Sequence, residues 1–338
     1  MLAQLTSGDK KYVQLFDVLD HLSEYDEAKV FKKFKLDPKF EKQYPYNKNY
    51  LYNTILNSLV YFHKGIDAEL SSLTMQVRIL LEKSLFFQAK KLLNKAKETV
   101  ATQEKFEDLL KLLRIENDIL KRTENMKLLP SALRQVEFEE KVVMDKITNL
   151  MGFHRLETQT YLLVQTRHVA RKEGEEEGVV RLLANPLLQE ESSALSNRAR
   201  IQFNEIRRRI AYFKGDHETA LDFAKRTVEL YDASKAIKED EKLDYILRLS
   251  LFAHHKLWVD GAAEARILIE RIKDVKVNNQ RERNEKFKRY YLYCLSLFVS
   301  TGEVAPDGFF EEFSKELSAL ENDMAVGMRL MSSYFCAD

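Results

Sequence analysis

The segment at residues 201–231, IQFNEIRRRIAYFKGDHETALDFAKRTVELY, predicts two helices joined by a tight turn. Its second half places a stripe at the spacing of one helix face, at Ala220, Phe223, Ala224, Thr227, Val228 and Tyr231. Its first half carries a separate stripe, at Phe203, Ile206, Ile210 and Phe213. Neither helix can bury its stripe alone, so we expect the two to fold back on each other as an antiparallel hairpin.

The turn of this hairpin has residues that end one helix and begin the next. Gly215 is expected to adopt the left-handed conformation that closes the first helix. Asp216 is expected to cap the second helix, and Glu218 adds negative charge to its first turn. The rest of the chain repeats this pattern of stripe, turn and stripe, with only 10 glycines and 5 prolines in 338 residues. The composition therefore predicts an all-α protein.

Small residues at the turns resemble those of the tetratricopeptide repeat (TPR) family. Gly215 and Ala220 match the small residues that end the first helix and let the second approach closely, and Ser84 and Ala89 stand in the same register. A third turn repeats the pattern, at Trp258, Gly261 and Ala265. The match is to a degenerate repeat, since Thr227 stands where the family usually has alanine. The resemblance covers residues 66–320 and implies an α-solenoid of TPR-like antiparallel helix hairpins; the alternative is a generic helical solenoid or bundle.

Three regions are expected along the chain. Residues 1–65 predict a three-helix lead-in, a small helical bundle ahead of the repeats. Residues 66–321 form the predicted TPR-like array, and residues 322–338 a C-terminal capping helix.

Within these regions the local signals predict particular breaks between helices. An irregular link is expected at 38–45 between two prolines. Separate helices are expected at 130–150 and 154–171, divided by Gly152, and one continuous helix at 190–213.

The spacing of polar residues does not predict catalysis. The seven histidines form no Glu-x-x-His or His-Glu-x-x-His pattern, and no phosphate-binding glycine loop occurs. His254 and His255 are neighbours, so their rings are expected on different helix faces, one in the core and one on the surface. We therefore expect a protein that is not an enzyme, with no catalytic residues, no cofactor and no metal.

Two basic segments raise the alternative of nucleic-acid binding. Eight lysines lie at 29–64 with only two acidic residues, and Tyr44, Tyr46, Tyr50 and Tyr52 lie among them. The competing interpretation is a solvated face whose tyrosines pack the lead-in helices, and the absence of arginine favours it. The second segment, at 281–289, has five basic residues on a predicted helix, diluted by acids such as Glu282.

The repeat register predicts a partner-binding groove. Arg78 and Arg209 are each eleven residues before a small turn residue, and Ser250 has the same register in the third unit. His254 is one turn further on, and Tyr212 lies close to Arg209 in the middle unit. In TPR proteins that bind a peptide carboxylate, this register is often polar or basic. The alternative is that both arginines are ordinary solvated residues paired with acids on their own helices.

These features together predict a non-catalytic scaffold or adaptor that binds a protein or peptide on the concave face of its repeats. The alternative is a regulatory or nucleic-acid-associated protein, whose basic N-terminal domain precedes ligand-sensing repeats; this order is also similar to the layout of bacterial peptide-pheromone receptors. Two distant cysteines, no apolar run of membrane length and no signal-peptide pattern predict a cytoplasmic protein without membrane contact.

Overall fold

The computed structural model describes residues 11–22, 25–34, 38–62, 66–165 and 175–318. Within these ranges every regular element is a helix, so the predicted all-α class is confirmed. The chain divides into two compact units, Met1–Met75 and Gln76–Asp338, and each is described by itself. The domain limits expected at residues 65 and 321 stay predictions, and the expected capping helix lies outside the described residues.

The N-terminal unit is built on three helices, α1 (Lys11–Asp20), α2 (Glu27–Lys33) and α3 (Pro38–Phe62). The carboxylate of Asp26 caps α2 by accepting from the amide of Ala28 at 2.9 Å. The small core of the unit consists of side chains from all three helices, at Leu15, Val30, Phe40, Tyr44 and Leu51.

The irregular link expected between Pro38 and Pro45 is wrong. The helix α3 begins at Pro38, where the missing amide costs nothing, and it continues through Pro45. An interior proline removes a backbone hydrogen bond and costs roughly 3 kcal/mol. Aromatic packing beside it offsets this cost, because Phe31 lies 6.3 Å from Phe40 and 4.9 Å from Tyr44, centroid to centroid.

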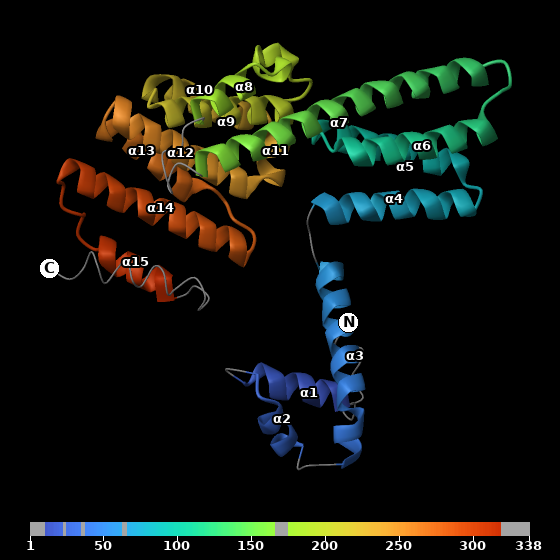
Figure 1. The fold of residues 1–338 in the computed structure, drawn as a ribbon. Coiled ribbons are helices and arrows are strands. Elements are labelled where there is room, and N and C mark those ends of the chain that lie inside the picture. The colour runs from blue at the N-terminus through green and yellow to red at the C-terminus, as the bar shows by residue number, and fades with distance from the viewer. Residues whose placement is uncertain (1–10, 23–24, 35–37, 63–65, 166–174, 319–338) are drawn as a thin grey trace. The chain divides into compact units, whose positions relative to one another are not determined.

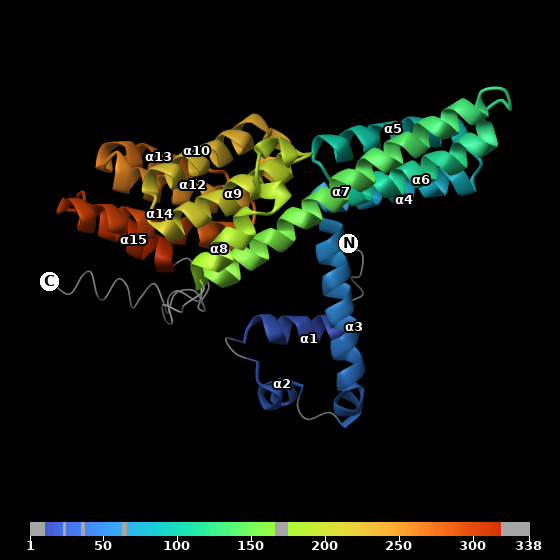
Figure 2. The same ribbon diagram turned by 45° about the horizontal axis from the view of Figure 1, so that its top comes forward.

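The helix α4 (Ile66–Glu82) crosses the boundary between the two units. The C-terminal unit continues with a succession of helices (Figures 1 and 2): α5 (Phe86–Thr102), α6 (Phe106–Thr123), α7 (Leu129–Gln165), α8 (Glu175–Leu183), α9 (Asn197–Lys214), α10 (His217–Ala233), α11 (Lys235–Asp240), α12 (Lys242–Val259), α13 (Ala262–Asp274), α14 (Gln280–Thr301) and α15 (Phe309–Ser318). Neighbours pack in a chain of contacts from α5 to α6, α7, α9, α10, α12, α13 and α14.

The hairpin predicted at residues 201–231 is confirmed as α9 and α10. Gly215 has φ +79° and closes α9, and Asp216 caps α10 by accepting from the amide of Thr219 at 3.0 Å. Ala220 is fully buried where the two helices meet. The local signals of turn and stripe were therefore sufficient to predict this hairpin.

Two other helix boundaries differ from the expectation. The helix α7 runs unbroken through Gly152, whose role is close packing: a β-carbon there would stand 2.8 Å from a methyl group of Leu187. The helix α9 begins only at Asn197, because Ser196 caps it by accepting from the amide of Ala199 at 3.1 Å. Two short 3₁₀ turns, Pro186–Leu188 and Glu191–Ser193, occupy the segment before it.

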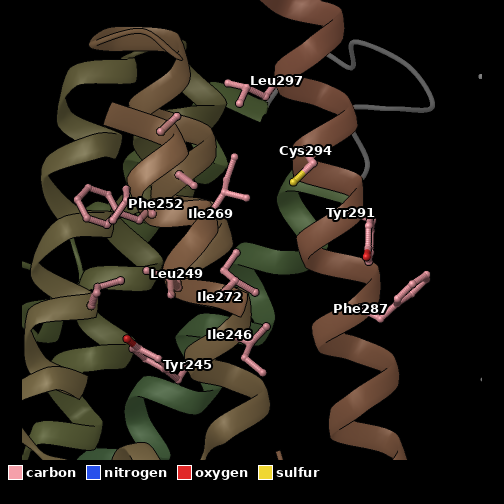
Figure 3. Close-up of a cluster of buried hydrophobic side chains, with 14 of the residues drawn as sticks. Tyr245, Ile246, Leu249, Phe252, Ile269, Ile272, Phe287, Tyr291, Cys294 and Leu297 are labelled. Carbon is pink, nitrogen blue, oxygen red and sulfur yellow. The ribbon is translucent and has the colours of Figure 1, made fainter. Parts of the chain in front are cut away.

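The largest core of this unit lies among α10, α12, α13, α14 and α15. Figure 3 shows the side chains of α12 and α13 facing one another, with α14 beside them. Its fully buried aliphatic residues include Ile246, Leu249 and Ile272. Because each helix contributes a stripe to a shared interior, these five helices form one packed body.

Three helix ends in this unit share one backbone motif. After α4, α5 and α9 a residue adopts a left-handed conformation, with φ of +58° at Ser84, +53° at Glu104 and +79° at Gly215. In each case the next amide donates to the carbonyl five residues before it, as Leu85 does to Leu80 at 2.9 Å. Only the third position has glycine, so the first two are strained.

Glu104 has a second role that explains its strained position. Its carboxylate accepts from the amides of Asn197 and Arg198, both at 2.8 Å, and so satisfies the free N-terminus of α9. The guanidinium of Arg198 in turn pairs with Asp240 at 2.6 Å and with Glu241. The turn between α5 and α6 is thereby tied to α9 and, through Arg198, to the junction between α11 and α12.

The different roles of Ser84 and Glu104 predict opposite effects on stability when each is replaced by glycine. Ser84→Gly should raise the free energy of unfolding by about 1 kcal/mol, because it removes the left-handed strain of a side chain that binds nothing distant. Glu104→Gly should lower it by about 1–2 kcal/mol, because two charge-assisted hydrogen bonds are lost. Urea titrations of the two variants measure both values, and changes of the same sign would contradict this account.

Candidate functional site

Aromatic and imidazole rings from four helices gather at the C-terminal end of α9. The members of this aromatic–imidazole cluster are Tyr212 on α9, His217 on α10, His254 and Trp258 on α12, and Tyr293 on α14. Tyr212 lies 5.7 Å from His217 and 6.1 Å from His254, between ring centroids. The rings of His217 and Trp258 stack at 6.0 Å with an interplanar angle of 12°, and Tyr293 lies 6.2 Å from His254.

The cluster is partly exposed to solvent, and its side chains are positioned by the helices that carry them. Trp258, the single tryptophan of the chain, is 67% exposed, and Tyr212 is 42% exposed. His217, His254 and Tyr293 are half-buried. The turn after α9 brings Tyr212 and His217 together, while His254 and Trp258 are one turn apart on α12. Rigid helices therefore present these rings with little freedom to rearrange.

A buried histidine forms the floor of the cluster. The ring of His255 lies 5.3 Å from that of Tyr212, and only 1% of the residue is exposed. Its Nε2 atom lies 3.1 Å from Nη1 of Arg208. Arginine can only donate, so Nε2 must accept and the proton must reside on Nδ1. Burial and the nearby charge of Arg208 lower the pKa of His255 to about 3, so the ring is neutral at pH 7.

Arg208 belongs to a buried charge network centred on Glu205. The Glu205 carboxylate accepts from Nε of Arg208 at 3.0 Å and pairs with Nη1 of Arg248 at 3.0 Å. Glu205 is 1% exposed and both arginines are below 10%. Burial alone would raise the pKa of Glu205, but the two guanidinium groups outweigh it and lower the pKa to about 2. This network joins α9 to α12 directly beneath the aromatic surface.

The surroundings of His254 favour the neutral form of its ring. Burial lowers its pKa, and the charges of Arg208 and His217 lower it further. At neutral pH the ring is therefore uncharged, so it offers a neutral hydrogen-bonding edge beside Tyr212 and Trp258. The prediction that one ring of the histidine pair lies in the core is confirmed by His255, while His254 is half-buried rather than fully on the surface.

The structure brings together two of the five residues predicted for the groove, Tyr212 and His254. Arg209 turns toward α7, where it pairs with Glu157 at 2.8 Å and lies over the ring of Tyr161. Ser250 is fully buried and its hydroxyl donates to a backbone carbonyl of its own helix at 2.7 Å. Arg78 is exposed on α4, in a different part of the unit.

The other members of the site have weaker signals in the sequence. Trp258 has only the signal of a turn residue, and neither His217 nor Tyr293 is singled out by a pattern. The network of Glu205, Arg208 and Arg248 resembled ordinary helix-surface charge. The spacing of His254 and Trp258 by four residues was the one local indication that both side chains share a helix face.

The described part of the chain carries no group of three or more histidine, cysteine, aspartate or glutamate residues placed to hold a metal ion. Among the described helices, none combines the length and the apolar character that a membrane span needs. No protein-family model, curated protein or solved structure matches the chain.

Proposed function

We propose that this protein is a non-catalytic binding module whose aromatic–imidazole cluster contacts a protein or peptide partner. The observation that carries the proposal is Trp258, a large aromatic side chain that is 67% exposed although its ring is stacked on His217. Exposed tryptophan and tyrosine on rigid elements are the side chains that dominate interface energies. Their presentation costs little conformational entropy on binding, because packing already fixes the rings.

The architecture we propose for this module is a TPR-like α-solenoid. Support comes from the succession of neighbouring helices in α5–α14 and from the shared left-handed turn motif at Ser84, Glu104 and Gly215. In such an array the helices of successive hairpins form a continuous concave binding face. The cluster, with residues from four helices that contact one another in turn, α9, α10, α12 and α14, is the part of the unit best suited to serve as that face.

The chemistry of the cluster indicates which partner segments would bind. Neutral imidazole and phenol groups supply hydrogen-bond donors and acceptors, and the indole and phenol rings supply flat apolar contact. The positive charge beneath it, on Arg208 and Arg248, is already neutralised in part by Glu205. An extended peptide with proline or aromatic side chains is the partner class that such a surface favours.

The single tryptophan makes this proposal directly testable. Peptides selected from a random display library against the full chain should shift the emission of Trp258 to shorter wavelength on binding. Trp258→Ala should weaken their binding by roughly 2 kcal/mol or more, as expected for a hot-spot residue. Ile267→Ala, which removes a 60%-exposed side chain of α13 outside the cluster, is the matched control. Equal binding by both variants, measured by calorimetry, would contradict the proposal.

A second candidate function, nucleic-acid binding, is favoured by one observation in the N-terminal unit. Of the tyrosines among the lysines, Tyr44 is buried, but Tyr46 and Tyr52 are 72% and 61% exposed. The rings of Tyr46 and Tyr50 stack at 6.5 Å along the helix. Exposed aromatic rings between basic residues can stack on unpaired bases.

Anisotropy titrations with a labelled single-stranded oligonucleotide test this second candidate. If it is correct, affinity should fall steeply as salt rises from about 50 to about 200 mM, because bound phosphates release counterions. Tyr46→Ala should weaken binding, whereas Tyr25→Ala, on a different segment, should not. Absence of binding at the lower salt concentration would eliminate this function and leave the peptide-binding proposal untouched.

A further inference from the structure

A hollow of about 460 Å³ lies beside the N-terminal half of α14, apart from the aromatic–imidazole cluster. We call it the α14 pocket. It is formed by the C-terminal end of α13, by α14 and by α15, and its main lining residues are Lys273, Arg283, Lys286, Phe287, Tyr290 and Glu316. Its volume falls within the range of small-molecule binding sites.

The wall of the α14 pocket is aromatic and firmly packed. Phe287 is 3% exposed and stacks on Phe313 of α15 at 5.5 Å between centroids. Tyr291 lies 4.7 Å from Phe287, and Figure 3 shows the two side chains on the same side of α14. This wall is preformed, so an apolar ligand would not have to rearrange it.

Two of the three cations in the pocket lack an acidic partner among the residues that the structure describes. The ammonium of Lys286 donates to the carbonyl of Val275 at 2.8 Å, and no carboxylate of the described residues lies within ion-pairing distance of it. Burial lowers the pKa of Lys286, which shows that its charge is poorly solvated. Arg283 is exposed and likewise has no acidic partner in the described part of the chain. Lys273 is held by Glu312 at 3.2 Å.

A second hollow, lined in part by residues that follow α13, has cations that are mostly paired within the protein. It measures about 410 Å³, and its cations are Lys238, Lys242, Arg271 and the exposed Lys276. Lys238 and Arg271 both pair with Asp232, at 2.8 and 2.7 Å, and Lys242 pairs with Glu239 at 2.8 Å. Three of its four cations therefore pair with carboxylates of the protein, whereas Lys286 and Arg283 have no such partner among the described residues and are the cations available to an external anion.

From this difference we infer that the α14 pocket binds a small amphipathic carboxylate, whose anionic head meets Lys286 and Arg283 and whose apolar body lies against Phe287 and Tyr290. The single acidic lining residue is Glu316. Burial and the neighbouring Glu312 raise its pKa, so Glu316 is more readily protonated when a carboxylate binds beside it. The basic segment at 281–289 noted in the sequence thereby acquires a specific role, because two of its members line one cavity.

Three probes with the same apolar chain and different heads test the inference on the full-length protein. Octanoate, octanol and octylammonium are titrated separately by calorimetry. Octanoate should bind at least about tenfold more tightly than octanol, and octylammonium should bind least, since a charge-assisted hydrogen bond to a carboxylate is strong. Lys286→Met should bring the affinity for octanoate severalfold closer to that for octanol, because only Arg283 then remains to meet the head.

Lys288→Met is the matched control, because Lys288 is on the same helix and does not line the pocket. It should retain the full preference for octanoate. Equal binding of octanoate and octanol, no octanoate binding at millimolar concentration, or the same loss in both lysine variants would each overturn the inference. None of these results depends on Trp258, so failure here is distinguishable from failure of the peptide-binding proposal.

Discussion

Glu205→Gln is expected to lower the free energy of unfolding by about 3–5 kcal/mol, because it leaves two buried guanidinium groups without a counter-charge. Arg208 and Arg248 both pair with this carboxylate, and all three residues are less than 10% exposed. Glutamine has nearly the same shape, so the loss reports charge rather than volume. Urea unfolding of the full chain, followed by circular dichroism and by Trp258 fluorescence, measures it.

Glu157→Gln is the matched control for this prediction. It removes a carboxylate that pairs with Arg209, which is on the same helix as Arg208. The Glu157 side chain, however, is 29% exposed. The remaining guanidinium of Arg209 is 17% exposed and still lies 3.9 Å from a carboxylate oxygen of Glu205, so the expected loss is about 1 kcal/mol or less. If both variants lost the same free energy, or if Glu205→Gln lost less than Glu157→Gln, the network would not be the buried unit described above.

Features set by neighbouring residues could be predicted from the sequence. The hairpin of α9 and α10 follows from two stripes, the glycine at 215 and the cap at Asp216, and all of these act within a few residues of one another. Helix ends determined by distant contacts could not be predicted. Gly152 looks like a break until Leu187 is seen packed against it, and Pro45 looks like a link until aromatic packing stabilises the helix around it.

The candidate functional site also combines residues that could be predicted from the sequence with residues that could not. Tyr212 and His254 could be singled out by their register relative to a turn, and the structure places their rings 6.1 Å apart. The buried network could not be foreseen, because Glu205 and Arg208 belong to a run of charges that reads as a helix surface. Their burial depends on Arg248 and His255, more than 40 residues later, and helix periodicity carries no information about such pairs.

The stability of the C-terminal unit is expected to fall as the pH is lowered from about 7 to about 4, because His255 cannot take up a proton without leaving Arg208. Its pKa is lowered from an ordinary value near 6.5 to about 3, so between these values the unfolded chain binds a proton that the folded chain does not. Stability is then lost at up to about 1.4 kcal/mol per pH unit. The lowered pKa of His254 acts in the same direction.

Below about pH 4.5 Glu205 adds to this loss. Its pKa is about 2 in the folded chain, so the unfolded chain again binds the extra proton as the pH falls. Urea midpoints measured at intervals from pH 7 to pH 4 test both steps. His255→Gln keeps an oxygen that can accept from Arg208 but does not titrate, so the slope from pH 6.5 to pH 4.5 should shrink. The same change at the exposed His154 should leave the slope as it is, and a wild-type slope in His255→Gln would show that another group controls the acid sensitivity.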